Sequence, residues 1–271
     1  MAGMVGIDRR GKPRSVLIVE DDPVIANLIQ TFLMAKDYLI INIVDSGESS
    51  LYAAVTSLPD IILMDIDLFG KIDGITATRL ITSMLKLPVI FISAQDDDET
   101  FSLAAAAEPA SFITKPFTGK DLYSNIEIAL HNNDIRKRSK HYNPGPLLRL
   151  MRESLSALDA YFIVDPVGRI MYVNPYAEHI LGTDRYTPIM VSINRYMTFR
   201  DTRSKQVYNN TFKDVIREAA LLGVRHNLAL IMADGSHRAM SIYAYPIRTS
   251  ADDHIGYLVR AHKLRTSEMK I

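Results

Sequence analysis

The sequence has 271 residues, enough for two domains of ordinary size, and apolar residues make up 48% of it. Its 31 Lys and Arg residues balance its 31 Asp and Glu residues, so net charge gives no indication of binding to nucleic acid or to an anionic membrane. The absence of Cys excludes disulfides, thiolate metal sites and a Cys nucleophile, and no apolar run approaches the ~20 residues of a membrane-spanning helix.

The chain opens with a short basic segment. Residues 1–13 contain Arg9, Arg10 and Lys12, and the apolar run that follows is shorter than the roughly 7–15 residues that a signal peptide needs. We expect these residues to form a flexible tail.

From residue 14 to residue 133, short apolar runs alternate with segments that have helical periodicity. The predicted strands are 16–19, 39–44, 61–64, 89–92 and 112–114. The predicted helices are 24–33, 50–57, 74–84, 99–108 and 121–131, the last with Asp121 as its N-cap. This alternation predicts a flavodoxin-like α/β fold, in which five parallel strands have the order 2-1-3-4-5.

Polar residues follow four of these strands. Glu20 and Asp21 follow the first, Asp65 the third, Ser93 the fourth and Lys115 the fifth. Parallel strands end at a common edge, where open α/β sheets bind ligands. Clustered carboxylates repel unless a cation joins them, and Mg²⁺ prefers such oxygen ligands. Lys115 and Ser93 suit a phosphoryl group, so Asp65 is a candidate nucleophile that forms an acyl phosphate.

This pattern resembles the receiver domain of two-component response regulators. The resemblance implies that Asp65 accepts a phosphoryl group from a histidine kinase or a phosphotransfer protein. It implies that Asp21 and Asp65 bind Mg²⁺, with help from Glu20 and from the main-chain carbonyl of Asp67. The remaining implied roles are hydrogen bonds from Ser93 and Lys115 to the phosphoryl oxygens.

The same resemblance assigns Phe112 to the aromatic switch position, where Tyr is common. Phe lacks a hydroxyl group, so any switching at this position must act through packing. The third acid of the first run, Asp22, is expected to face solvent.

A second chemical interpretation fits Asp65-Ile66-Asp67. Haloacid dehalogenase-like phosphatases are similar at this point, with a nucleophilic Asp and a general-acid Asp two residues later. In that family the metal-binding acids come later in the chain, whereas here Glu20 and Asp21 come first. The order favours the receiver domain.

Residues 134–153 are predicted to be a linker that includes an amphipathic helix. Arg136, Lys137, Arg138 and Lys140 either extend the preceding helix or are solvated, and 144–146 (Pro-Gly-Pro) breaks any helix. Apolar residues then recur at spacings of three and four: Leu147, Leu148, Met151, Leu155 and Leu158. Their stripe is expected to pack on its own domain or on a partner.

Residues 154–265 are predicted to form an α+β domain with an antiparallel sheet. Strands at 161–165 and 170–174 precede a helix from Pro175, and a helix over 212–222 precedes a hairpin of 228–232 and 238–245 and a last strand at 255–261. This run is similar to a PAS domain. PAS domains sense small ligands or mediate dimerisation, so a homodimer is possible and the ligand is unknown.

No helix-turn-helix, kinase glycine motif or conventional effector enzyme is recognised in the sequence. We therefore expect a cytoplasmic, non-enzymatic response regulator that signals through its PAS domain and binds neither DNA nor a membrane. The alternatives are the phosphatase named above and a PAS small-ligand sensor with a vestigial receiver domain.

Overall fold

The computed structural model describes residues 6–8, 11–94, 98–138, 159–232, 235–248 and 252–264. The chain divides into two compact units, Met1–Leu148 and Arg149–Ile271. The amphipathic helix predicted over 147–158 lies outside the described residues, as does most of the predicted linker. Among the helices that the structure describes, none is long and apolar enough to cross a membrane.

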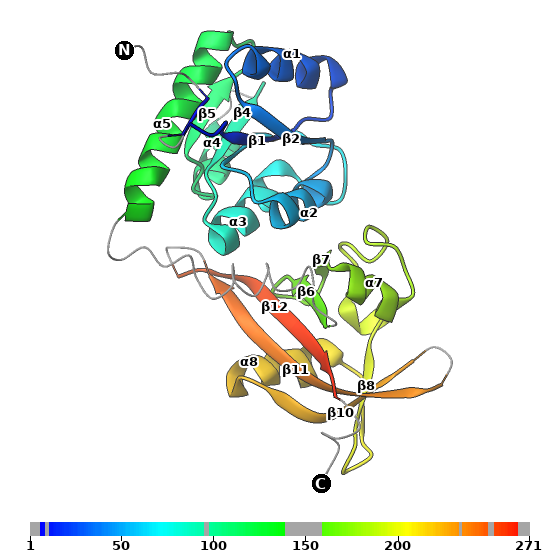
Figure 1. The fold of residues 1–271 in the computed structure, drawn as a ribbon. Coiled ribbons are helices and arrows are strands. Elements are labelled where there is room, and N and C mark those ends of the chain that lie inside the picture. The colour runs from blue at the N-terminus through cyan, green and yellow to red at the C-terminus, as the bar shows by residue number, and fades with distance from the viewer. Residues whose placement is uncertain are drawn as a thin grey trace. The chain divides into compact units, whose positions relative to one another are not determined.

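Strands and helices alternate along the first unit (Figure 1). Its strands form one parallel sheet in the order β2-β1-β3-β4-β5, which confirms the predicted topology. In chain order the elements are β1 (Ser15–Val19), α1 (Pro23–Met34), β2 (Leu39–Val44), α2 (Gly47–Ser57), β3 (Ile61–Asp65), α3 (Gly74–Leu85), β4 (Val89–Ser93), α4 (Asp98–Ala105), β5 (Ser111–Thr114) and α5 (Gly119–Arg138).

Helices cover both faces of this sheet (Figure 1), which explains why β1, β3 and β4 are apolar and buried along almost their whole length. Helices α1 and α5 contact each other, and so do α2 and α3. Burial of each Ile, Leu or Val side chain contributes roughly 1.5–3 kcal/mol. The core beneath α1 and α5 includes Val16, Ile18, Ile29, Leu33, Ile61, Leu63, Ile90, Ile92 and Ile126.

Helix α5 begins and ends at different residues from those predicted. Asp121 is not its N-cap: the carboxylate of Asp121 accepts the N–H of Thr118 at 2.9 Å, and the hydroxyl of Thr118 accepts the N–H of Asp121 at 3.3 Å. This reciprocal pair is a capping box, in which Thr118 occupies the cap position. The helix also continues to Arg138, past its predicted end at residue 131 and past the predicted domain boundary at residue 133.

Two arginines hold the last turns of α5 against the first unit. Arg14 donates to Asp134 at 2.5 Å, and Arg136 donates to the carbonyl of Lys86 at 2.5 Å. These contacts explain why Arg136, Lys137 and Arg138 extend the helix, which is one of the two alternatives that the sequence left open.

Part of the segment predicted to be a flexible tail is held in place. Ile7 forms an antiparallel bridge with Pro13, and Arg14 donates its N–H to the carbonyl of Gly6 at 2.7 Å. Gly6 is buried, and its N–H donates to Glu127 of α5. The described residues between 6 and 13 therefore form a turn that contacts the first unit.

The second unit contains an antiparallel sheet in the order β7-β6-β12-β11-β10-β8-β9. The short turn between β6 and β7 depends on Gly168, because a Cβ there would lie 2.5 Å from the ring of Phe212. In chain order the elements are β6 (Ala160–Val164), β7 (Ile170–Val173), α7 (Pro175–Leu181), η1 (Ile193–Arg195), β8 (Thr198–Asp201), β9 (Val207–Tyr208), η2 (Phe212–Ile216), α8 (Arg217–Leu222), β10 (Arg225–Ile231), β11 (His237–Arg248) and β12 (His254–Lys263).

Five of these strands correspond to predicted ones, whereas β8 and β9 were not predicted. Both are short, and Arg200 and Asp201 interrupt the apolar pattern of β8. The helix predicted over 212–222 is divided into a π-helical turn, η2, and the α-helix α8. A π-helical turn has no simple periodic signal in the sequence.

Candidate phosphoacceptor site

The carboxyl ends of four strands meet at one edge of the parallel sheet. Glu20 and Asp21 directly follow β1, Asp65 ends β3, Ser93 ends β4 and Lys115 directly follows β5. The register of the sheet aligns these ends, because β3 lies between β1 and β4, and β4 pairs with β5. The paired positions nearest the edge are Val19 with Met64, Asp65 with Ile92, and Ser93 with Thr114.

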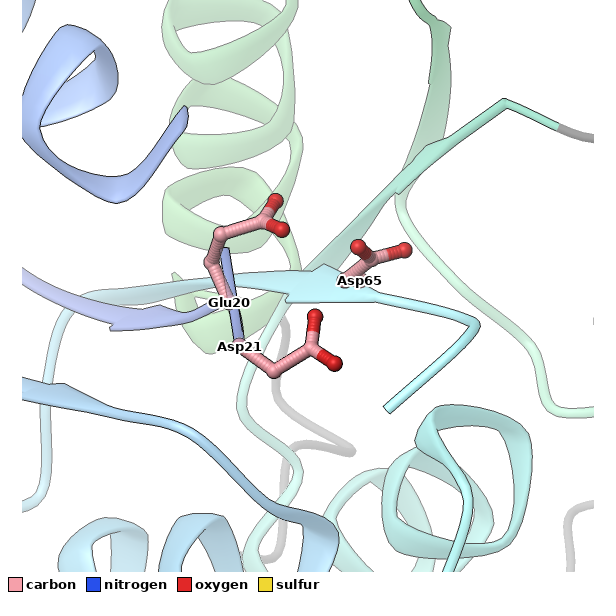
Figure 2. Close-up of side chains that lie close together, drawn as sticks. All are labelled: Glu20, Asp21 and Asp65. Carbon is pink, nitrogen blue, oxygen red and sulfur yellow. The ribbon is translucent and has the colours of Figure 1, made fainter. Parts of the chain in front are cut away.

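Three carboxylates cluster at this edge (Figure 2). One oxygen each from Glu20, Asp21 and Asp65 lies within 4.8 Å of the other two. Glu20 and Asp65 are buried, with 3% and 5% of their surface exposed, whereas Asp21 is half-buried. Buried like charges at this distance repel strongly, so the cluster needs positive charge nearby.

Lys115 supplies part of that charge. Its Nζ donates to Oδ2 of Asp65 at 2.7 Å and to Oε2 of Glu20 at 2.9 Å. Its main-chain N–H donates to the carbonyl of Ser93 at 2.8 Å, which fixes the start of the side chain. The amine therefore bridges the two buried carboxylates that the sequence predicted at this edge.

The pKa shifts at this edge result from an excess of acidic over basic side chains. Burial and, to a smaller extent, the nearby charge of Asp65 raise the pKa of Glu20 to about 7, although the hydrogen bond from Lys115 opposes both effects. Burial alone would lower the pKa of Lys115, but its hydrogen bonds to Asp65 and Glu20 raise it above its usual value. Lys115 thus stays charged, whereas the protonation of Glu20 would respond to any further cation.

The donor set fits a hard divalent cation. Mg²⁺ takes oxygen ligands, usually one or two carboxylates with water and phosphate. Glu20, Asp21 and Asp65 offer three such oxygens close together, and a cation would offset the burial and the repulsion that raise the pKa of Glu20.

The loop after β3 is held close to Asp65 by a glycine that sequence analysis did not single out. A Cβ on Gly74 would lie 2.0 Å from the main-chain oxygen of Asp65, so only glycine fits there. The N–H of Asp67 donates to Oδ1 of Asp65 at 3.2 Å. Helical periodicity alone gives no signal for such a contact.

Helix α2 also contacts this loop. The carboxylate of Glu48 accepts the N–H of Lys71 at 2.7 Å. A Cβ on Gly47 would lie 2.3 Å from the carbonyl of Ile72. These contacts join residues more than twenty positions apart, so no local pattern in the sequence predicts them.

The other predicted residues occupy distinct positions around the cluster. Ser93 is buried at the end of β4, with 7% of its surface exposed. The side chain of Asp67 is exposed, and its predicted ligand is the main-chain carbonyl. Asp22 is exposed as expected, but it also caps α1 by accepting the N–H groups of Val24 and Ile25. The Asp-Pro pair at this position was an available signal for that cap.

Phe112, the predicted switch residue, is half-buried on β5. Its ring centroid lies 5.5 Å from that of Phe91 on β4 and 4.9 Å from that of Phe101 on α4. More than half of the surface of Phe101 is exposed. The ring of Phe112 therefore joins a buried aromatic side chain to one at the surface.

Residues 16–127 match the family model for the response regulator receiver domain. One curated relative is the alkaline phosphatase synthesis transcriptional regulatory protein PhoP of Bacillus subtilis, 29% identical over 125 residues, which are 45% of this chain and 50% of that protein. Another is the transcriptional regulatory protein PdtaR of Mycobacterium tuberculosis, 30% identical over 118 residues, which are 44% of this chain and 57% of that protein. The chain thus spans about half the length of these relatives.

A solved structure that matches is the signal receiver domain of a modulated diguanylate cyclase from Desulfovibrio desulfuricans. It is 34% identical, with a TM-score of 0.44, and the match covers 45% of this chain and 97% of that one. A complex of CheX and CheY with BeF3 and Mg from Borrelia burgdorferi is 26% identical, with a TM-score of 0.43, over 45% of this chain and 92% of that one.

Proposed function

Since residues 16–127 form a response regulator receiver domain, we propose that this protein is a two-component regulator in which Asp65 accepts a phosphoryl group. The donor is the phosphohistidine of a histidine kinase or of a phosphotransfer protein. The observation that carries the proposal is the buried carboxylate of Asp65, at the end of β3, with the amine of Lys115 at 2.7 Å.

The transfer is a displacement at phosphorus. A carboxylate oxygen of Asp65 forms a bond to phosphorus as the bond between phosphorus and the histidine nitrogen breaks, and that nitrogen leaves with the electron pair. Lys115 and Ser93 stand at the same strand edge and serve as donors to the phosphoryl oxygens. The product is an acyl phosphate on Asp65.

Mg²⁺ is the proposed cofactor. Asp21 and Asp65 hold it, with Glu20 and the main-chain carbonyl of Asp67 as further ligands. When bound, the ion neutralises charge that gathers on the phosphoryl oxygens and the carboxylates. The oxygens within 4.8 Å of one another support this assignment for three of the four residues.

Phosphorylation is proposed to act through Phe112. The added charge beside the ends of β4 and β5 biases the arrangement of these elements. The contacts of Phe112 with Phe91 and Phe101 support a readout that depends on packing.

The second unit is proposed to be a PAS domain that converts the phosphorylated state into altered self-association or partner binding, without a DNA-binding step. Support comes from the neighbour order β7-β6-β12-β11-β10 and from the succession of two strands, a mostly helical segment that also contains the short strands β8 and β9, and three antiparallel strands. Its ligand is unassigned.

The proposal is tested by incubating the full chain with Mg²⁺ and acetyl phosphate, and separately with a phosphorylated histidine kinase. Intact mass spectrometry then counts the phosphoryl groups gained. We expect one group on the wild-type chain, none on Asp65→Asn and one on Asp67→Asn, whose exposed side chain is the matched control. A chain that gains no phosphoryl group from either donor contradicts the proposal.

The same experiment separates the regulator from a phosphatase. A phosphatase that uses Asp65 and Asp67 releases many equivalents of inorganic phosphate per chain and fails when Asp67 becomes Asn. A regulator retains about one equivalent, and its Asp67→Asn variant behaves as the wild type does.

A further inference from the structure

The loop between β3 and α3, residues 66–73, is closed at its base. Gly74, the first residue of α3, donates its N–H to the carbonyl of Ile66 at 3.2 Å. A Cβ at position 74 would lie 2.0 Å from the main-chain oxygen of Asp65, so the two ends of the loop are in contact. These contacts fix the base of the loop next to the carboxylate that is the proposed phosphoacceptor.

A side chain of α2 holds the second half of the same loop. Oε1 of Glu48 accepts the N–H of Lys71 at 2.7 Å. Oε2 of Glu48 lies close to Gly70, because a Cβ added at position 70 would be 2.6 Å from this oxygen. Gly70 also has a φ of +134°, a conformation that residues with a side chain rarely adopt. Glu48 therefore joins α2 to the loop at Gly70 and Lys71.

The carboxylate of Glu48 is not fully satisfied in this position. Oε2 is buried and has no hydrogen-bond partner among the residues that the structure describes. A buried polar atom without a partner destabilises a fold by roughly 1–3 kcal/mol. The first turn of α2 offsets part of this cost, because the positive end of the helix dipole lies there. Within the described part of the chain, the hydrogen bonding of this carboxylate is directed at the loop.

Asp67 lies between the closed base and the contact with Glu48. Its N–H donates to Oδ1 of Asp65 at 3.2 Å, and its main-chain carbonyl is a proposed ligand of Mg²⁺. Contacts on both sides of Asp67 restrict the rotation of its peptide groups. A ligand that is held in place before a cation arrives loses less conformational entropy when the cation binds.

We propose that Glu48 is a positioning residue for the cation site. Its hydrogen bond to the N–H of Lys71 holds the loop that carries the carbonyl of Asp67, and in this way it raises the affinity of the site for Mg²⁺. The inference rests on the proposed function of the carboxylate cluster, and Glu48 acts through the loop without touching the cation. Removal of a group that supports a metal ligand typically lowers metal affinity by roughly 10- to 100-fold.

The charge of Glu48 offers a different explanation, in which the carboxylate attracts the cation from a distance. Asp45 separates the two explanations, because it is exposed and carries the same charge two residues before the start of α2. Asp45→Asn removes a charge and leaves the loop contact in place. Glu48→Gln removes a charge and keeps an oxygen that can accept the N–H of Lys71, whereas Glu48→Ala removes both.

The test uses the full-length wild-type chain and these three variants, and circular dichroism confirms that each is folded. Mg²⁺ is titrated into each protein, and amide chemical shifts measured by nuclear magnetic resonance report binding. Hydrogen exchange of the Lys71 amide is measured separately in the metal-free proteins.

We expect Glu48→Ala to bind Mg²⁺ about tenfold or more weakly than the wild type. In the metal-free protein, the same substitution should speed exchange of the Lys71 amide about tenfold. Glu48→Gln and Asp45→Asn should stay within about threefold of the wild type in both measurements, since both keep an acceptor for this amide.

Equal weakening in Glu48→Ala and Glu48→Gln overturns the proposal, because charge alone would then explain the effect. Unchanged exchange at Lys71 in Glu48→Ala also overturns it. A wild-type chain that binds no Mg²⁺ overturns the proposed function together with this inference, whereas binding that is unchanged in Glu48→Ala overturns the inference alone.

Discussion

Both units bury carboxylates, but the balance of charge around them differs. In the first unit Glu20 and Asp65 share a single amine, that of Lys115, and Asp21 adds a third carboxylate to the cluster. Acids outnumber bases there, and the pKa of Glu20 is raised to about 7 by burial and by its acidic neighbour.

In the second unit a single carboxylate, that of Asp159, receives both the guanidinium group of Arg260 and the ring nitrogen of His262. Burial alone would lower the pKa of Arg260, but the hydrogen bond to Asp159 raises it. The charge of the carboxylate is fully matched within the unit.

This difference in charge balance separates a site that binds a ligand from an ion pair that only stabilises the fold. A cluster with excess negative charge is less stable without a further cation, which is the arrangement expected where Mg²⁺ and a phosphoryl group bind. A carboxylate with matched partners needs no further cation, and its removal leaves two half-buried side chains without an acceptor. The same residue type therefore opposes folding in one unit and stabilises it in the other.

The largest expected effect is in the second unit. Asp159→Asn should lower the free energy of unfolding by about 3 kcal/mol, because the half-buried guanidinium of Arg260 loses its counter-charge and its acceptor. Hydrogen exchange of the β12 amides measures this change. The control is Asp252→Asn, which removes an exposed partner of Arg248 and should change stability by less than about 0.5 kcal/mol. Equal effects of the two substitutions would contradict the comparison.

Magnesium should stabilise only the first unit. At a concentration about 100 times its dissociation constant, Mg²⁺ should raise the free energy of unfolding by about 2.7 kcal/mol. Hydrogen exchange in β3 and β4 should slow accordingly, while that in β12 should not change. Asp21→Asn should greatly reduce the response, and Asp22→Asn, the neighbouring helix cap, should keep it. Full stabilisation of Asp21→Asn by Mg²⁺ would contradict the proposed metal site.

The smallest effect concerns pH. In the metal-free protein the pKa of Glu20 is raised from 4.5 to about 7, so the folded state binds more protons than the unfolded state between these values. Stability should therefore fall as pH rises through this window. Glu20→Gln should flatten the profile and be the more stable form at about pH 8, above the raised pKa, as urea denaturation would show. The same slope in both proteins would mean that Glu20 ionises freely.

The sequence predicted the first unit well because its signals are local and repeated. Each buried strand is a short apolar run, and each crossover helix has its own periodicity, so the alternation alone implies a parallel sheet. A parallel sheet then brings the ends of its strands together. This is why Glu20, Asp21, Asp65 and Lys115 could be placed at one edge before any distance was known.

The parts that sequence analysis missed depend on contacts between distant residues. Position 74 must be glycine because a Cβ there would clash with the main-chain oxygen of Asp65. The hydrogen bond from Arg260 to Asp159 joins residues 101 positions apart. The last turn of α5 is held by the hydrogen bond from Arg136 to the carbonyl of Lys86. None of these contacts leaves a periodic pattern.

The account rests on the phosphoryl group being bound to Asp65. After phosphorylation in Mg²⁺, sodium borohydride reduces an acyl phosphate to an alcohol, so the modified residue can be located by peptide mass spectrometry. We predict homoserine at position 65 and unmodified Asp at 21, 22 and 67. Reduction at another residue, or a phosphoryl group that resists borohydride because it is held by Ser93, would contradict the account.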